Sequence, residues 1–168
     1  MNNVEKLFER IRVIHLDCMK ICKSVLGEYL PVAGNIGVFC QSDDEYELFE
    51  QVKQTITLPS SNPQQKYFEL KDLLTVEGIE NVPARTYTHL YIRKPDPTSY
   101  GKYLGDMDFV LEPDKYFELK TKVMNNLVPG AIIYDRENWD TIEMTNTEFN
   151  TVSYVSTQAF AEKVRVRF

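Results

Sequence analysis

The chain has 168 residues and a net charge of −6, from 25 acidic and 19 basic side chains. A chain of this length usually forms one domain, and hydrophobic residues, at 43%, are numerous enough to fill one core, which excludes disorder throughout. No run of Lys or Arg reaches the length of a basic tract, so a nucleic acid is a poor candidate partner. We therefore expect a single α+β domain over residues 1–168.

Targeting signals are not found in the sequence. The first residues, Met1 to Lys6, lack the basic start and apolar block of a secretion signal, and no window approaches the length of a membrane span. The cysteines, Cys18, Cys22 and Cys40, are odd in number, which indicates free thiols in a reducing compartment. These features predict a cytoplasmic protein that does not enter a membrane, and they leave its oligomeric state open.

The first third of the chain has helical periodicity. Apolar residues recur at helical spacing over residues 3–29, which predicts a long amphipathic N-terminal helix ended by Gly27 and a following proline. A strand at 36–40 and a second helix at 42–55 come next, and the helix starts at a Ser followed by three acidic residues. Residues 59–63 then read as a loop.

The remainder of the chain is dominated by strand signals, with a third helix at 113–127 and a short one at 158–162. The predicted strands are 67–76, 86–94, 103–111, 131–136, 141–146, 152–156 and a last one at 164–168. This order indicates a mainly antiparallel sheet, with the long N-terminal helix and two further helices packed on one side. The C-terminal half has the order β-α-β-β-β.

The best predicted strand carries the first candidate site. Alternation sends Tyr87, His89, Tyr91 and Arg93 to one face, with the intervening Leu and Ile facing the core. Aromatic rings beside an ionisable His and a cationic Arg are suited to a small anionic ligand. The alternative is an exposed sheet face with tyrosines paired across strands.

A second candidate site is the pair Asp106 and Asp108, which project from one face of one strand. Two such carboxylates repel each other, so a divalent metal or a basic side chain is expected beside them. A strand with Asp-x-Asp that follows another strand and precedes a helix resembles the nucleotidyltransferase superfamily. That resemblance implies that both aspartates hold metal ions, with Asp135 or Glu143 as a third carboxylate. Where that family has a Gly-Ser turn, this chain has Arg93-Lys94-Pro95.

The β-α-β-β-β order over 103–156 also resembles a module of the vicinal oxygen chelate (glyoxalase-like) superfamily, with residues 35–94 as a degenerate first module. This resemblance implies a metal held by His and Glu side chains of the sheet. His89 and Glu143 are the residues that could take that role.

Three further features have ordinary structural interpretations. His15, Cys18 and Cys22 share one sector of the first helix, as a metal site would require, but that sector is its apolar stripe, which favours core packing. Trp139, near a hairpin tip, is expected to fill the core rather than to anchor a partner. In the last strand, Arg165 and Arg167 are expected on a solvated edge.

Three hypotheses about function remain. The first is a non-enzymatic binding or interaction domain that presents the His89, Tyr91 and Arg93 face to a small ligand or acidic group. The second is a divalent-metal-dependent enzyme that uses Asp106 and Asp108, with His89 or Glu143 as a further ligand or base. The third is a structural or assembly role with the N-terminal helix as the partner surface.

Overall fold

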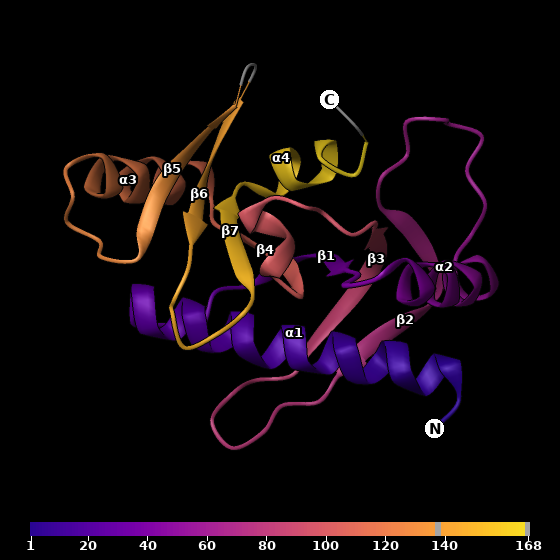
Figure 1. Ribbon diagram of the computed structural model, residues 1–168. Coiled ribbons are helices and arrows are strands. Elements are labelled where there is room, and N and C mark those ends of the chain that lie inside the picture. The colour runs from indigo at the N-terminus through magenta and orange to yellow at the C-terminus, as the bar shows by residue number, and fades with distance from the viewer. Residues whose placement is uncertain (137–138, 167–168) are drawn as a thin grey trace.

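The computed structural model describes residues 1–136 and 139–166, and its strands form one seven-stranded mixed sheet (Figure 1). The strand order is β2-β3-β1-β4-β7-β6-β5. The pairs β1/β3 and β4/β7 are parallel, and the other four pairs are antiparallel. The α+β class is therefore confirmed, with more parallel pairing than the sequence indicated.

The long N-terminal helix, α1 (Asn3–Leu26), has clear start and stop signals. Asn2 and Glu5 form a reciprocal capping box, and the helix ends at Gly27, whose φ of 79° is left-handed and suits glycine. Its apolar stripe is buried against the sheet, with Leu7 and Ile11 fully covered. The apolar stripe of α1 is therefore used largely within its own chain.

The sheet consists of two similar halves joined at its centre. The first half contains β1 (Val32–Phe39), α2 (Asp43–Ile56), β2 (Phe68–Val76) and β3 (Arg85–Arg93). The second contains β4 (Gly105–Val110), α3 (Pro113–Met124), β5 (Ala131–Arg136), β6 (Trp139–Met144) and β7 (Val152–Ser156). In each half the first strand runs parallel to the last, which pairs antiparallel with the strand before it in sequence. The antiparallel pair β1/β4 is therefore the seam between the halves.

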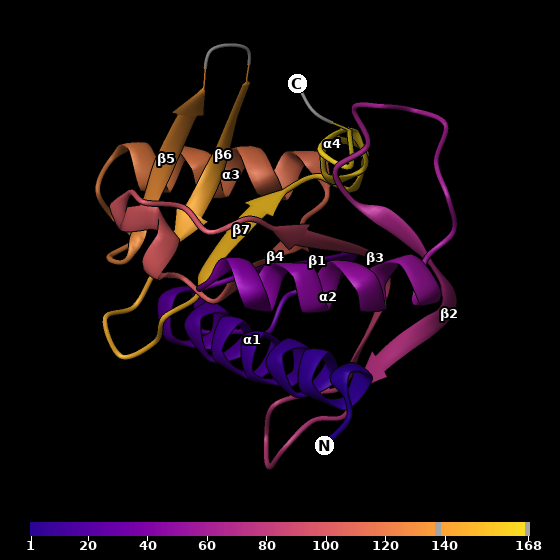
Figure 2. The same cartoon turned by 45° about the vertical axis from the view of Figure 1, so that its right-hand side comes forward.

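Strand alternation separates the two faces of this sheet. On β1, Ile36 and Val38 join the main core together with Met107 and Phe109 of β4, and α1, α2 and α3 all contribute to that core. The intervening residues of β1 and β4 face the opposite side, which is partly covered by α4 (Gln158–Lys163). Figures 1 and 2 show α1 and α4 on opposite sides of the central strands. The functional candidates lie on the α4 side.

One predicted face is wrong at Tyr87. This side chain is fully buried in the main core, where its hydroxyl lies 2.6 Å from Nδ1 of His15 on α1. Leu90 packs in the same core although it lies three positions further along, so alternation is interrupted between them. The pairing of β2 with β3 changes register at the same point, since Glu69 pairs with His89 and Leu74 with Tyr87.

The C-terminal strand is also wrong within the described residues. Residue 166 forms one isolated bridge with Gln65, and Arg165 is half-buried rather than solvated on an edge. Arg167 lies outside the described residues, as do the turn at 137–138 and the side chain of Trp139. Among the helices in the described part of the chain, none is long and apolar enough to cross a membrane.

Candidate functional site

A small cavity lies over the β1/β4 seam, on the side of the sheet opposite α1. Its volume is about 40 Å³. Its lining comes from both halves and from α4, and it consists of Lys66, Tyr67, Asp106, Asp108, Thr141, Tyr154, Ser156, Phe160 and Val164. The two halves of the fold and the C-terminal segment therefore meet at one polar, partly aromatic cavity.

Asp106 and Asp108 of β4 both face this cavity, as their spacing of two predicts. They are 7% and 8% exposed. Tyr67 donates a hydrogen bond from its hydroxyl to Oδ1 of Asp106 at 3.2 Å, and Asn35 of β1 donates from Nδ2 to Oδ2 of Asp108 at 3.0 Å. The pair is thus held from both sides by neutral donors.

Gly37 makes room for the carboxylate of Asp106. The two residues are directly opposite each other across the seam. A Cβ atom at Gly37 would lie 2.2 Å from Oδ1 of Asp106 and 3.3 Å from the hydroxyl oxygen of Tyr67. Any other residue at this position would therefore displace the carboxylate, which fits the use of glycine in strands where another group approaches closely.

The ionisation of Asp108 depends on its burial and on the charged groups near it. Burial, and then repulsion from Asp106, raise the pKa of Asp108 to about 7, although the hydrogen bond from Asn35 and the charges of Lys66 and Arg165 act in the other direction. Burial and the same carboxylates raise the pKa of Tyr67 well above its usual value, so its hydroxyl stays protonated and donates. Two acidic side chains and the basic side chain of Lys66 therefore share the lining of one small cavity.

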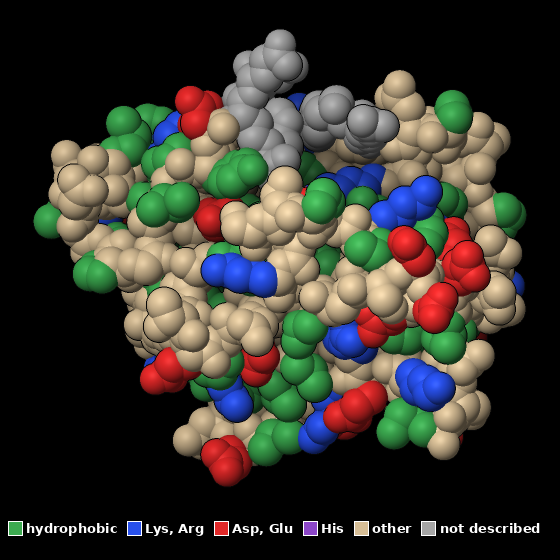
Figure 3. All heavy atoms as spheres, in the orientation of Figure 1, with side chains coloured by type: hydrophobic (Ala, Val, Ile, Leu, Met, Phe, Trp, Pro, Cys, Tyr) green, Lys and Arg blue, Asp and Glu red, His purple; other side chains and the backbone are tan. Residues whose placement is uncertain are grey.

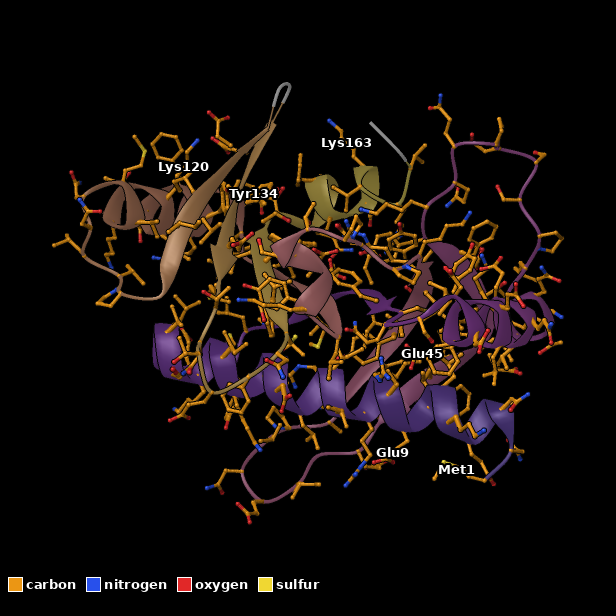
Figure 4. All side chains as sticks on the ribbon, in the orientation of Figure 1. Met1, Glu9, Glu45, Lys120, Tyr134 and Lys163 are labelled. Carbon is orange, nitrogen blue, oxygen red and sulfur yellow. The ribbon has the colours of Figure 1, made fainter. Side chains whose placement is uncertain are left out.

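Aromatic rings line one side of the site. Tyr154 of β7 packs with Phe39 and Tyr100 in a second, smaller apolar cluster on this face. The hydroxyls of Tyr154 and Tyr100 form a short hydrogen bond, and Tyr154 also donates to Oε2 of Glu143 at 3.3 Å. Tyr134, labelled on β5 in Figure 4, meets the Tyr154 ring edge-on at a centroid distance of 6.3 Å. These contacts fix the ring of Tyr154 at the wall of the cavity.

His89, Tyr91 and Arg93 lie on the same face but do not line the cavity described here. Tyr91 stacks against Tyr67 with ring centroids 5.3 Å apart and so supports the wall indirectly. Arg93 donates to Asp96 at 2.6 Å, and its guanidinium lies 4.7 Å from the centre of the Tyr100 ring.

His89 lies in a partly buried environment of its own. His89 is half-buried, and its Nδ1 lies 2.8 Å from the hydroxyl of Thr88. Burial, and then the charge of Arg165, lower the pKa of its imidazole. The imidazole is therefore neutral at physiological pH.

The acidic and cysteine candidates do not gather into a metal centre. Within residues 1–136 and 139–166, no group of three or more His, Cys, Asp or Glu side chains is placed to hold a metal ion. Glu143 accepts a hydrogen bond from the hydroxyl of Tyr154, on the wall of the cavity. His15, Cys18 and Cys22 are fully buried in the main core, as their apolar helix face predicted.

Sequence reasoning missed Asn35, Tyr67 and Arg165. The segment Gly34-Asn35-Ile36-Gly37 carried a usable signal, because a buried strand seldom contains two glycines and an amide unless other groups approach it closely. Arg165 donates from Nε to Oδ1 of Asn35 at 2.8 Å. That contact joins positions far apart in sequence, and local pattern does not reveal it.

The comparisons with known proteins concern the fold only. No family model and no curated protein matches the chain. One solved structure, described as "Structural Genomics, Protein EC4020", is similar, with a TM-score of 0.53 at 11% sequence identity, over 98% of this chain and 92% of that one. At this identity the likeness supports the arrangement of elements and assigns no activity.

Proposed function

We propose that this chain is a binding domain for a small organic cation, with Asp106 and Asp108 as the counter-charge. The observation that carries the proposal is the pair of buried carboxylates in one cavity at the seam of the two halves. Buried charges are strongly unfavourable unless they are paired. The raised pKa of Asp108 supports the view that its neighbours balance its charge incompletely.

The shape and lining of the cavity favour a planar or compact cationic group. Tyr67, Tyr154 and Phe160 offer aromatic surface beside the carboxylates, and cations are attracted to the faces of such rings. Two carboxylates two positions apart on a strand suit a group with several N–H donors, such as an amidinium or guanidinium. A volume of about 40 Å³ is little more than one water molecule occupies in the liquid, so even a compact headgroup enters only if the cavity opens.

The alternatives from the sequence are less well supported. The anionic-ligand hypothesis depended on Arg93, whose guanidinium is engaged by Asp96 and two aromatic rings. The metal-enzyme hypothesis requires a third acidic or imidazole ligand near the pair, and the described residues do not bring one there. Figure 3 shows acidic and basic side chains interspersed on one face of the molecule, so that face has no field of one sign.

The test uses benzamidine, which is cationic over the whole neutral range, and its neutral analogue benzamide. We expect benzamidine, but not benzamide, to raise the melting temperature in a concentration-dependent way. Replacing both acids (Asp106→Asn with Asp108→Asn) should weaken binding, measured by calorimetry, by at least about tenfold, because charge-assisted hydrogen bonds are lost. Asp135→Asn, which removes an exposed carboxylate of β5, is the matched control and should bind as the parent does.

Two further measurements distinguish a site for an organic cation from a metal site. Affinity for benzamidine should rise between pH 6 and pH 8, because Asp108 loses its proton over that range. Mg²⁺, Mn²⁺ or Zn²⁺ that stabilises the parent but not the double variant would instead favour a metal site. Equal shifts of the melting temperature with benzamidine and benzamide would contradict the cation proposal.

A further inference from the structure

The C-terminal segment, residues 157–166, covers the cavity and is held there by polar contacts to both halves of the fold. We call this segment the C-terminal lid. It contains α4, whose Phe160 and the following Val164 line the cavity. In Figures 1 and 2 it lies between β7 and the loop that precedes β2. Even a compact headgroup has no room in the cavity while the lid is in place.

Backbone contacts tie the end of the lid to the first half. The carbonyl oxygen of Arg165 accepts from the amides of Lys66 and Tyr67 at 2.9 and 3.0 Å. Asn35 donates from Nδ2 to the carbonyl oxygen of Ala161 at 2.9 Å. The lid thus bonds to Tyr67, a residue of the cavity wall, and to Asn35, which holds Asp108.

The side chain of Arg165 links the lid to the acid pair. Its Nε donates to Oδ1 of Asn35 at 2.8 Å, while the Nδ2 of the same Asn35 donates to Asp108 at 3.0 Å. The positive charge of Lys66, and after it that of Arg165, also favours the ionised form of Asp108. Arg165 therefore acts on the same negative charge that a cationic ligand would neutralise.

The apolar contacts of the lid include Phe160 and Val164, which are half-buried at the cavity. In α4 only Ala161 is buried, and the element spans six residues. Segments with little buried apolar surface open at low free-energy cost, so this part of the chain can separate from the sheet while the main core stays intact. Ligand entry and lid opening would then be coupled, and such coupling acts in both directions.

We propose that the C-terminal lid regulates the cavity, with Arg165 as a tethered cation that competes with the ligand, so that ligand binding releases the lid. This inference rests on the proposed function. The lid regulates the same site in three steps. An external cation binds the carboxylates, Arg165 is then no longer attracted by their negative charge, and residues 157–166 leave the cavity. Removing the charge of Arg165 therefore loosens the lid and improves ligand binding.

The experiment compares Arg165→Gln with the control Lys163→Gln. Lys163 is exposed on α4 and points away from the sheet (Figure 4), so its loss changes the charge of the lid equally without touching the cavity. Hydrogen exchange, followed by NMR, reports lid opening without any ligand through the amides of Lys66 and Tyr67. We expect Arg165→Gln, but not Lys163→Gln, to exchange these amides at least about fivefold faster, the low end of coupling between sites.

Binding of benzamidine is then measured for the same proteins. We expect Arg165→Gln to bind at least about fivefold more tightly than the parent. Arg165→Lys, which keeps the charge, should stay near the parent value, and it serves as the second variant if Arg165→Gln folds poorly. Saturating benzamidine should also speed exchange at Lys66 and Tyr67 in the parent.

The two proposals fail in distinguishable ways. Unchanged exchange at Lys66 and Tyr67 in Arg165→Gln, or faster exchange with no gain in affinity, would overturn the lid while parent binding still supports the cation site. Absence of benzamidine binding in all variants would overturn the cation site and the competition with it. In that case the ligand-free exchange rates would show separately whether Arg165 holds the segment.

Discussion

Asp108→Asn tests whether the fold carries an unfavourable buried charge at the seam. Asparagine keeps the shape of the side chain and can still accept the hydrogen bond that Asn35 donates. It resembles the protonated acid, which the structure favours, since burial and Asp106 raise the pKa of Asp108 from 3.8 to about 7. The substitution should therefore stabilise the protein where the parent is ionised.

The magnitude follows from two overlapping estimates, because the pKa shift of Asp108 includes the repulsion from Asp106. Two charges about 6.5 Å apart, the spacing of alternate residues on a strand, repel by about 2.5 kcal/mol at an effective dielectric constant of about 20. A rise in pKa of about three units corresponds to about 4 kcal/mol. We therefore expect Asp108→Asn to raise the free energy of unfolding by about 2–4 kcal/mol at pH 8 and the melting temperature by roughly 5–10 °C.

The sign of the pH dependence provides the control. Because the folded-state pKa of Asp108 lies above the unfolded one, the parent gains stability as pH falls from about 7 to 3.8, and the advantage of the variant disappears over that range. Urea unfolding of both proteins between pH 4 and pH 8 measures this. A loss of stability at pH 8, or a gain that is the same at pH 4 and pH 8, would refute the reasoning.

Two further predictions concern the buried polar groups around the sheet. Burial lowers the pKa of His15 to about 4, so stability that is present above pH 6.5 should be lost as pH falls, by about 2 kcal/mol at pH 5. His15→Gln should remove this pH dependence of the free energy of unfolding. Urea titrations made in the Asp108→Asn background measure it. Gly37→Ala should cost about 1–3 kcal/mol in the same assay because the new methyl group meets the carboxylate of Asp106. Adding Asp106→Ala should recover part of that loss, and no recovery would show that the clash lies elsewhere.

Helical and strand periodicity in the sequence predicted the α+β class and the long N-terminal helix. The helix stripe of α1, predicted over 3–29 and found over Asn3–Leu26, depends on contacts between neighbouring turns, which periodicity records directly. The Asp106 and Asp108 pair was found because alternation in β4 is uninterrupted. Their common face and common cavity follow from that spacing.

The errors arise where pairing partners determine the structure. Tyr87 faces the core at a point where the β2/β3 pairing changes register, and a change of register depends on both strands. β1 was predicted to start at 36, although it starts at Val32, because Gly34 and Asn35 weakened the apolar signal. Arg165 was placed on a solvated edge because its partner, Asn35, lies 130 positions away in sequence.

The two faces of the sheet differ in what they contribute to the molecule. The α1 side buries a continuous apolar core that accounts for stability. The α4 side buries Asp106, Asp108 and Asn35 together with Gly37, although well-packed apolar residues are often as stable as buried charges or more so. If the aspartates were structural, removing the charge of Asp108 would weaken the fold. If they serve a ligand, the same substitution should stabilise the fold while it reduces binding of benzamidine, a pairing of effects that is common where function requires an unfavourable group.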